Sequence, residues 1–166
     1  MDYRTAESSD AENIAFLINS AYRGDSARAG WTHEDDLVGG VRTRPDEIRS
    51  LLAKPGHHIL LALEENKLVG TVTLIDEGEN FYGSMFAVDP RLQNRKIGAF
   101  FLDEIRRFGK SSGKKFLRVG VINVRKELIE YYQRKGFILT GNSEPFPEEY
   151  PAKVEGLRLL EMLLPL

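Results

Sequence analysis

The segment Val88-Asp-Pro-Arg-Leu-Gln-Asn-Arg-Lys-Ile-Gly-Ala99 decides the fold, because it connects a predicted strand to a predicted helix. The apolar run 85–88 predicts a buried strand, which Asp89-Pro90 ends because proline supplies no ladder donor. Beyond a polar and basic stretch, apolar residues recur at helical spacing at Ile97, Phe101, Ile105 and Phe108. A strand, a polar turn and a helix in this order direct free backbone N–H groups and the positive end of a helix dipole to one place, which suits a phosphate group. Gly98 in the first turn lets the backbone approach a bulky anion, because no Cβ intervenes.

Composition and charge narrow the class of protein. A chain of 166 residues, 42% hydrophobic and 29% charged, is typical of a soluble globular protein, and we predict a single domain over residues 1–166. The formal net charge of −2 argues against a general nucleic-acid-binding protein, which needs a basic surface. No apolar run has membrane-spanning length and the N-terminal residues are polar and acidic, so we expect no membrane association, no signal peptide and a cytoplasmic location. The absence of cysteine excludes disulfides, thiolate metal sites and acyl transfer through a cysteine.

The sequence of the N-terminal half predicts a short strand, two helices and a three-stranded meander. Ser9 and Glu12 have the spacing of a capping box, and the helix that follows is expected to end before Gly24 with a left-handed cap. A second helix is expected from Pro45 to about Ala53. Three apolar runs separated by turn residues predict antiparallel strands at 59–63, 68–75 and 81–88.

The C-terminal half continues the alternation of strands and helices. A strand is predicted at 116–122, and Asn123 is expected to be the N-cap of a helix that Gly136 terminates. A further strand begins at Phe137, a proline-rich surface loop follows at 141–151, and the last strand is expected at 157–164. The order β-α-α-β-β-β-α-β-α-β-β does not suit a doubly wound sheet, because the meander precedes the strand–helix units.

The segment between the first two helices offers candidates with two interpretations each. Trp31 is either a packing anchor or a wall of a substrate site, and His33 is either simply exposed or functional.

The adjacent His57 and His58 lie in a predicted strand, where they would face opposite sides, so we expect no metal site.

The segment after the central strand resembles the acyl-CoA-binding signature of the GNAT (GCN5-related N-acetyltransferase) superfamily. The family pattern V-x-P-x-x-[Q/R]-x-x-G-x-[G/A] falls on Val88, Pro90, Gln93, position 96 and Gly98. The first glycine of the pattern is Lys96 here. We expect Lys96 to hold negative φ more readily than glycine and to offer charge to a pyrophosphate.

A second resemblance lies further along the chain. In this superfamily a strand ends in an asparagine, here Asn123, and a helix then presents a tyrosine four residues before a Gly-Phe pair, here Tyr132 before Gly136-Phe137. The interval from Asn123 to Tyr132 is two residues longer than the family leads us to expect. The chain also looks like a GNAT subgroup that ends in Thr-Gly-x-x-x-Pro-Phe-Pro, here Thr140–Pro147.

The resemblance implies both a fold and an activity. The fold would be α/β, a mixed and mostly antiparallel sheet of about seven strands flanked by about four helices. The activity would be direct transfer of an acetyl group from acetyl-CoA to a primary amine in a ternary complex, without a metal. Tyr132 would protonate the departing thiolate, since its hydroxyl is a donor that stays un-ionised at neutral pH. By the same resemblance the cofactor would contact Phe86, Ala87, Val88, Gln93, Asn94, Arg95, Lys96, Ile97, Gly98, Ala99 and Asn123.

The acceptor site and the general base are less constrained. The aromatic residues Tyr22, Trp31 and Tyr82, together with Ser84, suggest a site for a small amine, an amino acid or a peptide, and the acids at 34–36 and 76–79 could attract a cationic acceptor. The amine must lose a proton before it attacks, and several candidate bases remain open: Glu79, Ser84, His33, Glu34 or a water chain. The main alternative is a non-catalytic acyl-CoA-binding module, which would need the loop but not Tyr132. The chain is expected to be a monomer or a homodimer.

Overall fold

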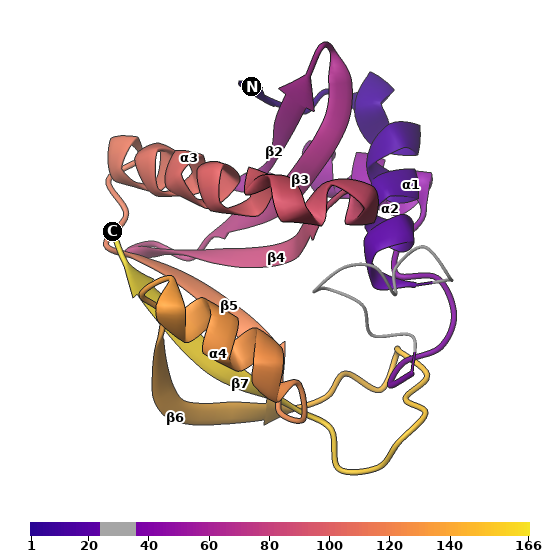
Figure 1. Ribbon diagram of the computed structural model, residues 1–166, viewed down its shortest axis with the longest axis vertical. Helices are drawn as coiled ribbons and strands as arrows, with labels where there is room; N and C mark the ends of the chain where they lie inside the picture. Colours follow the sequence, from indigo (N-terminus) through magenta and orange to yellow (C-terminus); the bar gives the residue numbers. More distant parts are fainter. Residues whose placement is uncertain (24–35) are drawn as a thin grey trace.

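The computed structural model describes residues 1–23 and 36–166 (Figure 1). Its strands are β1 (Asp2–Thr5), β2 (His57–Glu64), β3 (Lys67–Asp76), β4 (Asn80–Val88), β5 (Phe116–Ile122), β6 (Ile138–Pro145) and β7 (Arg158–Pro165). Its helices are α1 (Ala11–Tyr22), α2 (Pro45–Ala53), α3 (Ile97–Ser111) and α4 (Lys126–Arg134), with short 3-10 helices η1 (Ser8–Asp10) and η3 (Pro90–Arg95). None of the helices within the described ranges combines the length and the apolar character needed to cross a membrane.

The strands form one sheet in the order β1-β2-β3-β4-β5-β7-β6. Every neighbouring pair is antiparallel except β4 and β5, which run parallel. The seven strands and four α-helices of the described residues confirm the predicted architecture.

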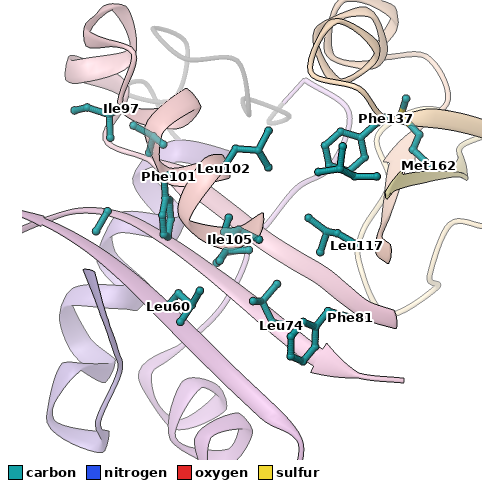
Figure 2. Packing of buried hydrophobic residues seen from close by; sticks show 14 of the residues in the cluster. Leu60, Leu74, Phe81, Ile97, Phe101, Leu102, Ile105, Leu117, Phe137 and Met162 are labelled. Atoms are coloured by element: carbon teal, nitrogen blue, oxygen red, sulfur yellow. The ribbon is translucent and has the colours of Figure 1, made fainter. Parts of the chain in front are cut away.

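The helices cover both faces of the sheet, α3 and α4 on one and α1 and α2 on the other (Figure 1). Successive strand residues point to opposite faces, so Leu60 packs in the core under α3 while Ile59 and Leu61 pack in the core under α1 and α2. Figure 2 shows the larger core, in which Phe101 and Ile105 of α3 lie over the sheet. Both side chains are almost fully buried, at 0% and 2% exposure.

The parallel pair β4–β5 separates part of the way along its length. The two strands pair only from Asn80 opposite Phe116 to Gly83 opposite Val119. Beyond Gly83 a β-bulge in β4 faces β3, and its Met85 has a φ of 51°. The strands therefore open toward the end of α1, and Figure 1 shows the gap between their ribbons. We call this region the β4–β5 gap.

A third, smaller core lies beside the β4–β5 gap and joins two segments that are far apart in the sequence. Val38 forms an isolated antiparallel bridge with Ala152, and two backbone hydrogen bonds of 2.8 and 2.7 Å lie beside this bridge. These contacts tie segment 36–43 to segment 146–157. The buried members of this core are Val38, Ile122 and Leu157.

Two predicted helix starts are wrong. Helix α1 begins at Ala11 after the turn η1, and the capping box is formed by Glu7 and Asp10 rather than by Ser9 and Glu12. The Asp10 carboxylate accepts the Glu7 N–H at 2.8 Å and also binds Arg4, so the helix entry is fixed before Ser9.

The second wrong start concerns Asn123, which is not the N-cap of α4. That helix begins at Lys126, and the side chain of Asn123 instead accepts the N–H of Arg158 at 3.0 Å and donates to the carbonyl of Gly156 at 3.3 Å. Residues 123–125 thus form an extra turn, which accounts for the longer interval before Tyr132. The predicted loop 141–151 begins later than expected, because β6 continues to Pro145 past an irregularity around Gly141, whose φ is 88°.

Candidate active site

A cavity of about 320 Å³ occupies the β4–β5 gap. Strands β4 and β5 supply its floor, α4 one wall, and the end of α1 together with segments 36–43 and 146–157 the other. Its lining includes three of the predicted site residues of the acceptor, Tyr22, Tyr82 and Ser84, and the predicted catalytic residue Tyr132. The cavity lies in the size range of small-molecule sites.

Tyr132 is held in place by the way in which α4 ends. The N–H of Phe137 donates to the carbonyl of Tyr132, and the N–H of Gly136 donates to that of Gln133, both at 3.0 Å. This is a Schellman motif with Gly136 in the left-handed conformation, at φ 100°. The hydrophobic contact that accompanies the motif joins the rings of Tyr132 and Phe137, whose centroids are 4.9 Å apart. The spacing of Tyr132, Gly136 and Phe137 therefore has a physical reason, because the cap fixes the tyrosine.

Burial strengthens the preference of Tyr132 for its protonated form, which is already the main form of tyrosine at neutral pH. Desolvation raises the pKa of its hydroxyl well above the ordinary value for tyrosine. The hydroxyl is thus a proton donor throughout the neutral range. The pKa of Tyr82 is raised by burial as well, so the phenols of both residues remain neutral in the cavity.

The short helix η3 turns directly into α3 at Lys96, and the prediction for the backbone of Lys96 is wrong. Lys96 does not hold negative φ; it adopts the left-handed conformation, at φ 61° and ψ 15°. The family's glycine would adopt this conformation without strain, and the lysine adopts it because η3 must turn directly into α3. The carbonyl of Lys96 accepts the N–H of Ala99 at 3.1 Å. The N–H groups of Ile97 and Gly98, the first two of the helix, have no acceptor inside the helix and can bind an anion.

Most of the other predicted cofactor residues already have partners in the fold or buried side chains. Arg95 is held by two hydrogen bonds of 2.7 Å to Glu64, and Asn123 is engaged with β7 as described above. The carbonyl of Phe86 accepts the hydroxyl of Tyr22 at 2.8 Å, while Ala87 and Val88 have buried side chains. The side chains of Gln93 and Asn94 lie outside the described part of the structure.

Helix α4 also meets the start of α3. A Cβ placed on Gly98 would lie 3.6 Å from the hydroxyl oxygen of Tyr131, the neighbour of Tyr132. The predicted phosphate-binding turn and the predicted catalytic tyrosine therefore lie beside the same gap. Tyr131 was not among the site residues predicted from the sequence.

Several candidates for the base and the acceptor site lie elsewhere. Trp31, His33 and Glu34 fall outside the described residues. Glu79 does not line the cavity. It directly precedes β4, next to the part of β4 that pairs with β5, and forms an ion pair with Lys115 at 2.7 Å. The nearby Asp76 and Glu77 pair with Lys114 and Arg118. The acids at 76–79 are thus used by the fold and do not form an attractive surface for a cationic acceptor in the cavity.

The cavity contains charged residues that the sequence analysis missed. Among the described residues that line it, the charged ones are Arg23, Arg42, Arg125 and Glu149. The subgroup resemblance at 140–147 came near Glu149, which segment 146–157 supplies, and the predicted residues Tyr22 and Asn123 lie close in the sequence to Arg23 and Arg125. Nothing in the local sequence marks Arg42, which reaches the cavity because the third core folds segment 36–43 against segment 146–157.

Comparison with known families identifies the class of this protein. The model of the acetyltransferase (GNAT) family matches residues 2–137. This range is most of the chain, so the chain belongs to that family and the protein is an acyltransferase. No curated protein matches the chain.

Solved structures share the fold at low sequence identity. The protein smu.2055 from Streptococcus mutans UA159 has a TM-score of 0.77 at 17% identity, over 99% of both chains. Ribosomal-protein-alanine N-acetyltransferase from Brucella melitensis has a TM-score of 0.73 at 16% identity, over 100% of both chains. A GNAT family acetyltransferase from Elizabethkingia anophelis, determined with acetyl-CoA bound, has a TM-score of 0.59 at 21% identity, over 73% of this chain and 82% of that chain.

Proposed function

We propose that the protein transfers an acetyl group from acetyl-CoA directly to a primary amine, with both substrates bound in the β4–β5 gap. The observation that carries this proposal is the placement of Tyr132, which the Schellman motif fixes at the wall of the cavity while Tyr131 meets the start of α3. The structural relative with acetyl-CoA bound supports the choice of acyl donor. The residues at the start of α3 fit the pyrophosphate of such a donor, because two backbone N–H groups and Gly98 meet at the positive end of a helix.

The residues divide the chemistry between them. The amine nitrogen bonds to the acetyl carbon and the carbon–sulfur bond breaks, so the amine gives up one proton and the sulfur takes one. The hydroxyl of Tyr132 supplies the proton to the sulfur and stabilises the charge that develops there, and the tyrosinate then regains a proton from water. Glu149 is the carboxylate at the cavity, among the described residues, that can accept the proton from the amine. The turn 95–99 holds the donor in place.

Acetyl-CoA binding is the first part of the test. At one hundred times its dissociation constant, acetyl-CoA should add about 2.7 kcal/mol to the free energy of unfolding. For a domain of this size that corresponds to a rise in melting temperature of roughly 5–11 °C. NADH and S-adenosylmethionine should give no such rise. If acetyl-CoA leaves the melting temperature unchanged at millimolar concentration, the proposed donor site is wrong.

The second part of the test separates an enzyme from a non-catalytic acyl-CoA-binding module. Tyr132→Phe should keep the acetyl-CoA-induced shift but release the CoA thiol roughly 10²- to 10⁴-fold more slowly, because it removes only the proton donor. Tyr3→Phe is the matched control, because Tyr3 does not line the cavity. Its ring stacks on the ring of Phe101 in α3, with the two centroids 5.9 Å apart. Unchanged turnover in Tyr132→Phe would exclude this tyrosine as the acid.

A further inference from the structure

The position of Arg42 beside the β4–β5 gap identifies a chemical feature of the acceptor. The backbone N–H of Arg42 donates to the side-chain oxygen of Asn19 at 2.7 Å, which anchors the residue to α1. Its guanidinium lies between two tyrosine rings, 5.6 Å from the centroid of Tyr22 and 5.1 Å from that of Tyr150. One of its nitrogens, Nη1, donates to the hydroxyl of Tyr150 at 3.2 Å. The side chain is therefore held in one place by contacts that leave its charge intact.

Among the described residues, none forms an ion pair with Arg42. Within residues 1–23 and 36–166, no carboxylate lies within ion-pair distance of its guanidinium, whereas the acids at 76–79 already pair with Lys114, Lys115 and Arg118. A guanidinium carries five N–H donors in a planar fork that matches a carboxylate. A partly buried arginine with donors to spare, stacked between aromatic rings at a substrate cavity, is suited to bind an anionic group of a ligand.

The anion in question does not belong to the acyl donor. The predicted phosphate-binding turn lies at the start of α3, next to α4, whereas Arg42 is carried by segment 36–43 and packs against segment 146–157. Arg42, Ser84, Met85 and Tyr150 also line a second cavity of about 440 Å³, which extends toward α2. Arg42 thus stands where the two cavities adjoin, on the side of the gap that is left for the acceptor.

We propose that Arg42 binds a carboxylate of the acceptor, so that the acceptor is a free amino acid or a similar small amine with a carboxylate close to its amine. This inference rests on the proposed function of the β4–β5 gap. It replaces the sequence-based expectation of a cationic acceptor, because the described lining of the cavity contains three arginines and one glutamate. A bidentate pair with Arg42 would orient the amine toward the transferable acetyl group, and the glutamate, Glu149, can contact the ammonium group.

The experiment compares acceptors that differ only in the carboxylate. Each of the twenty amino acids is assayed for acetylation beside its carboxamide, the amine left by removal of the carboxylate, and a dipeptide that begins with the same residue. At least one amino acid should be acetylated with a KM roughly 10- to 100-fold lower than that of its carboxamide, because a hydrogen bond to a charged group is lost in the amide. Equal use of amino acid and carboxamide overturns the inference, and so does preference for the dipeptides.

Variants of Arg42 test whether this residue makes the distinction. Arg42→Gln should raise the KM for the preferred amino acid roughly 10- to 100-fold, leave the KM for its carboxamide unchanged within about twofold, and leave acetyl-CoA binding unchanged. Arg42→Lys keeps the charge and should recover part of the loss. Arg44→Gln is the matched control, because Arg44 is exposed and lines neither cavity. An unchanged KM for the amino acid in folded Arg42→Gln protein overturns the inference.

Failure of the inference and failure of the proposed function give different results. If acetyl-CoA raises the melting temperature but no amino acid in the panel is acetylated, the inference is wrong while the donor site stands. If acetyl-CoA does not bind at all, the proposed function is wrong. The melting temperature of each variant without ligand shows whether it is folded.

Discussion

The two sides of the β4–β5 gap are built in different ways. The proposed cofactor side consists of residues 88–99 and 131–137, and the turns within each range are closed by hydrogen bonds between near neighbours in the sequence. The acceptor side joins the end of α1 with segments 36–43 and 146–157, and its contact between Arg42 and Tyr150 spans 108 positions. The turns of the proposed cofactor side are thus shaped locally, whereas the acceptor side depends on contacts between distant segments. A substrate preference can therefore change through distant segments without disturbing the turn that would hold the donor.

The strongest way to test this comparison is to remove one aromatic ring from the core under α3 and one from the acceptor side. Phe101→Ala takes a fully buried ring from the core under α3 and should lower the free energy of unfolding by about 3–5 kcal/mol. Phe146→Ala removes a half-buried ring that packs on Tyr150 and should cost no more than about 1 kcal/mol, while raising the KM for the acceptor. Denaturant unfolding measures both. Equal losses of stability would show that the acceptor side is as deeply integrated in the fold as the core under α3.

A smaller effect is expected from Gly98→Ala, which should separate folding from binding on the cofactor side. A Cβ at this position would meet only ordinary contacts, 3.6 Å from Tyr131 and 3.8 Å from Val88, and alanine favours a helix over glycine by about 1 kcal/mol. The melting temperature should therefore stay the same or rise. The family pattern allows glycine or alanine at this position, so acetyl-CoA affinity should change by less than about threefold, or about 0.7 kcal/mol. Titration of the folded variant with acetyl-CoA measures this, and a loss of more than about tenfold would show that the donor passes closer to this backbone than the pattern allows.

The smallest effect concerns Asp89, whose carboxylate caps the turn η3. It accepts the backbone N–H of Arg91 at 3.0 Å, and its hydrogen bonds to the Arg91 side chain lower its pKa below the ordinary value of 3.8. Asp89→Ala should cost about 1 kcal/mol of stability at neutral pH. Because the folded-state pKa is depressed, this contribution is present above pH 3.8 and is lost as the pH falls through the folded-state value, so wild type and variant should converge in acid.

The control for that measurement is Asp103→Ala on the outer face of α3, where the side chain is 55% exposed and forms a surface pair with Arg106. Such exposed pairs contribute little. Unfolding curves measured at neutral pH and near pH 3 give the comparison for both variants. A pH-independent difference between wild type and Asp89→Ala would contradict the assigned role of the carboxylate.

The sequence was most informative where the physics is local. The bounds of α2 and β5 were predicted correctly from proline placement and from alternating apolar residues, and the Gly136 cap was recognised from its type and position. Asn123 was misassigned because an asparagine after a strand is equally able to cap a helix or to hold another strand. Only the distant partners Gly156 and Arg158 decide between the two.

The acceptor side could not be predicted for the same reason. Arg42 lies in a segment without periodicity, and Tyr150 lies in a proline-rich loop. Their contact depends on the pairing of Val38 with Ala152, which no local sequence pattern predicts. Conversely, the sequence suggested that the acids at 76–79 were free to attract a cationic acceptor. In the structure, basic residues some forty positions later pair with them.

The conformation of Lys96 has a consequence for how such proteins are found. A search pattern that demands glycine at this position would reject this chain. Lys96 nevertheless has the left-handed conformation that glycine adopts readily, with a φ of 61°. The left-handed conformation costs a residue with a side chain roughly 1–2 kcal/mol, an amount that a folded domain can absorb. A dihedral angle can thus persist in a family after the residue that made it easy has been replaced. A rule written in backbone angles would include members that a rule written in letters leaves out.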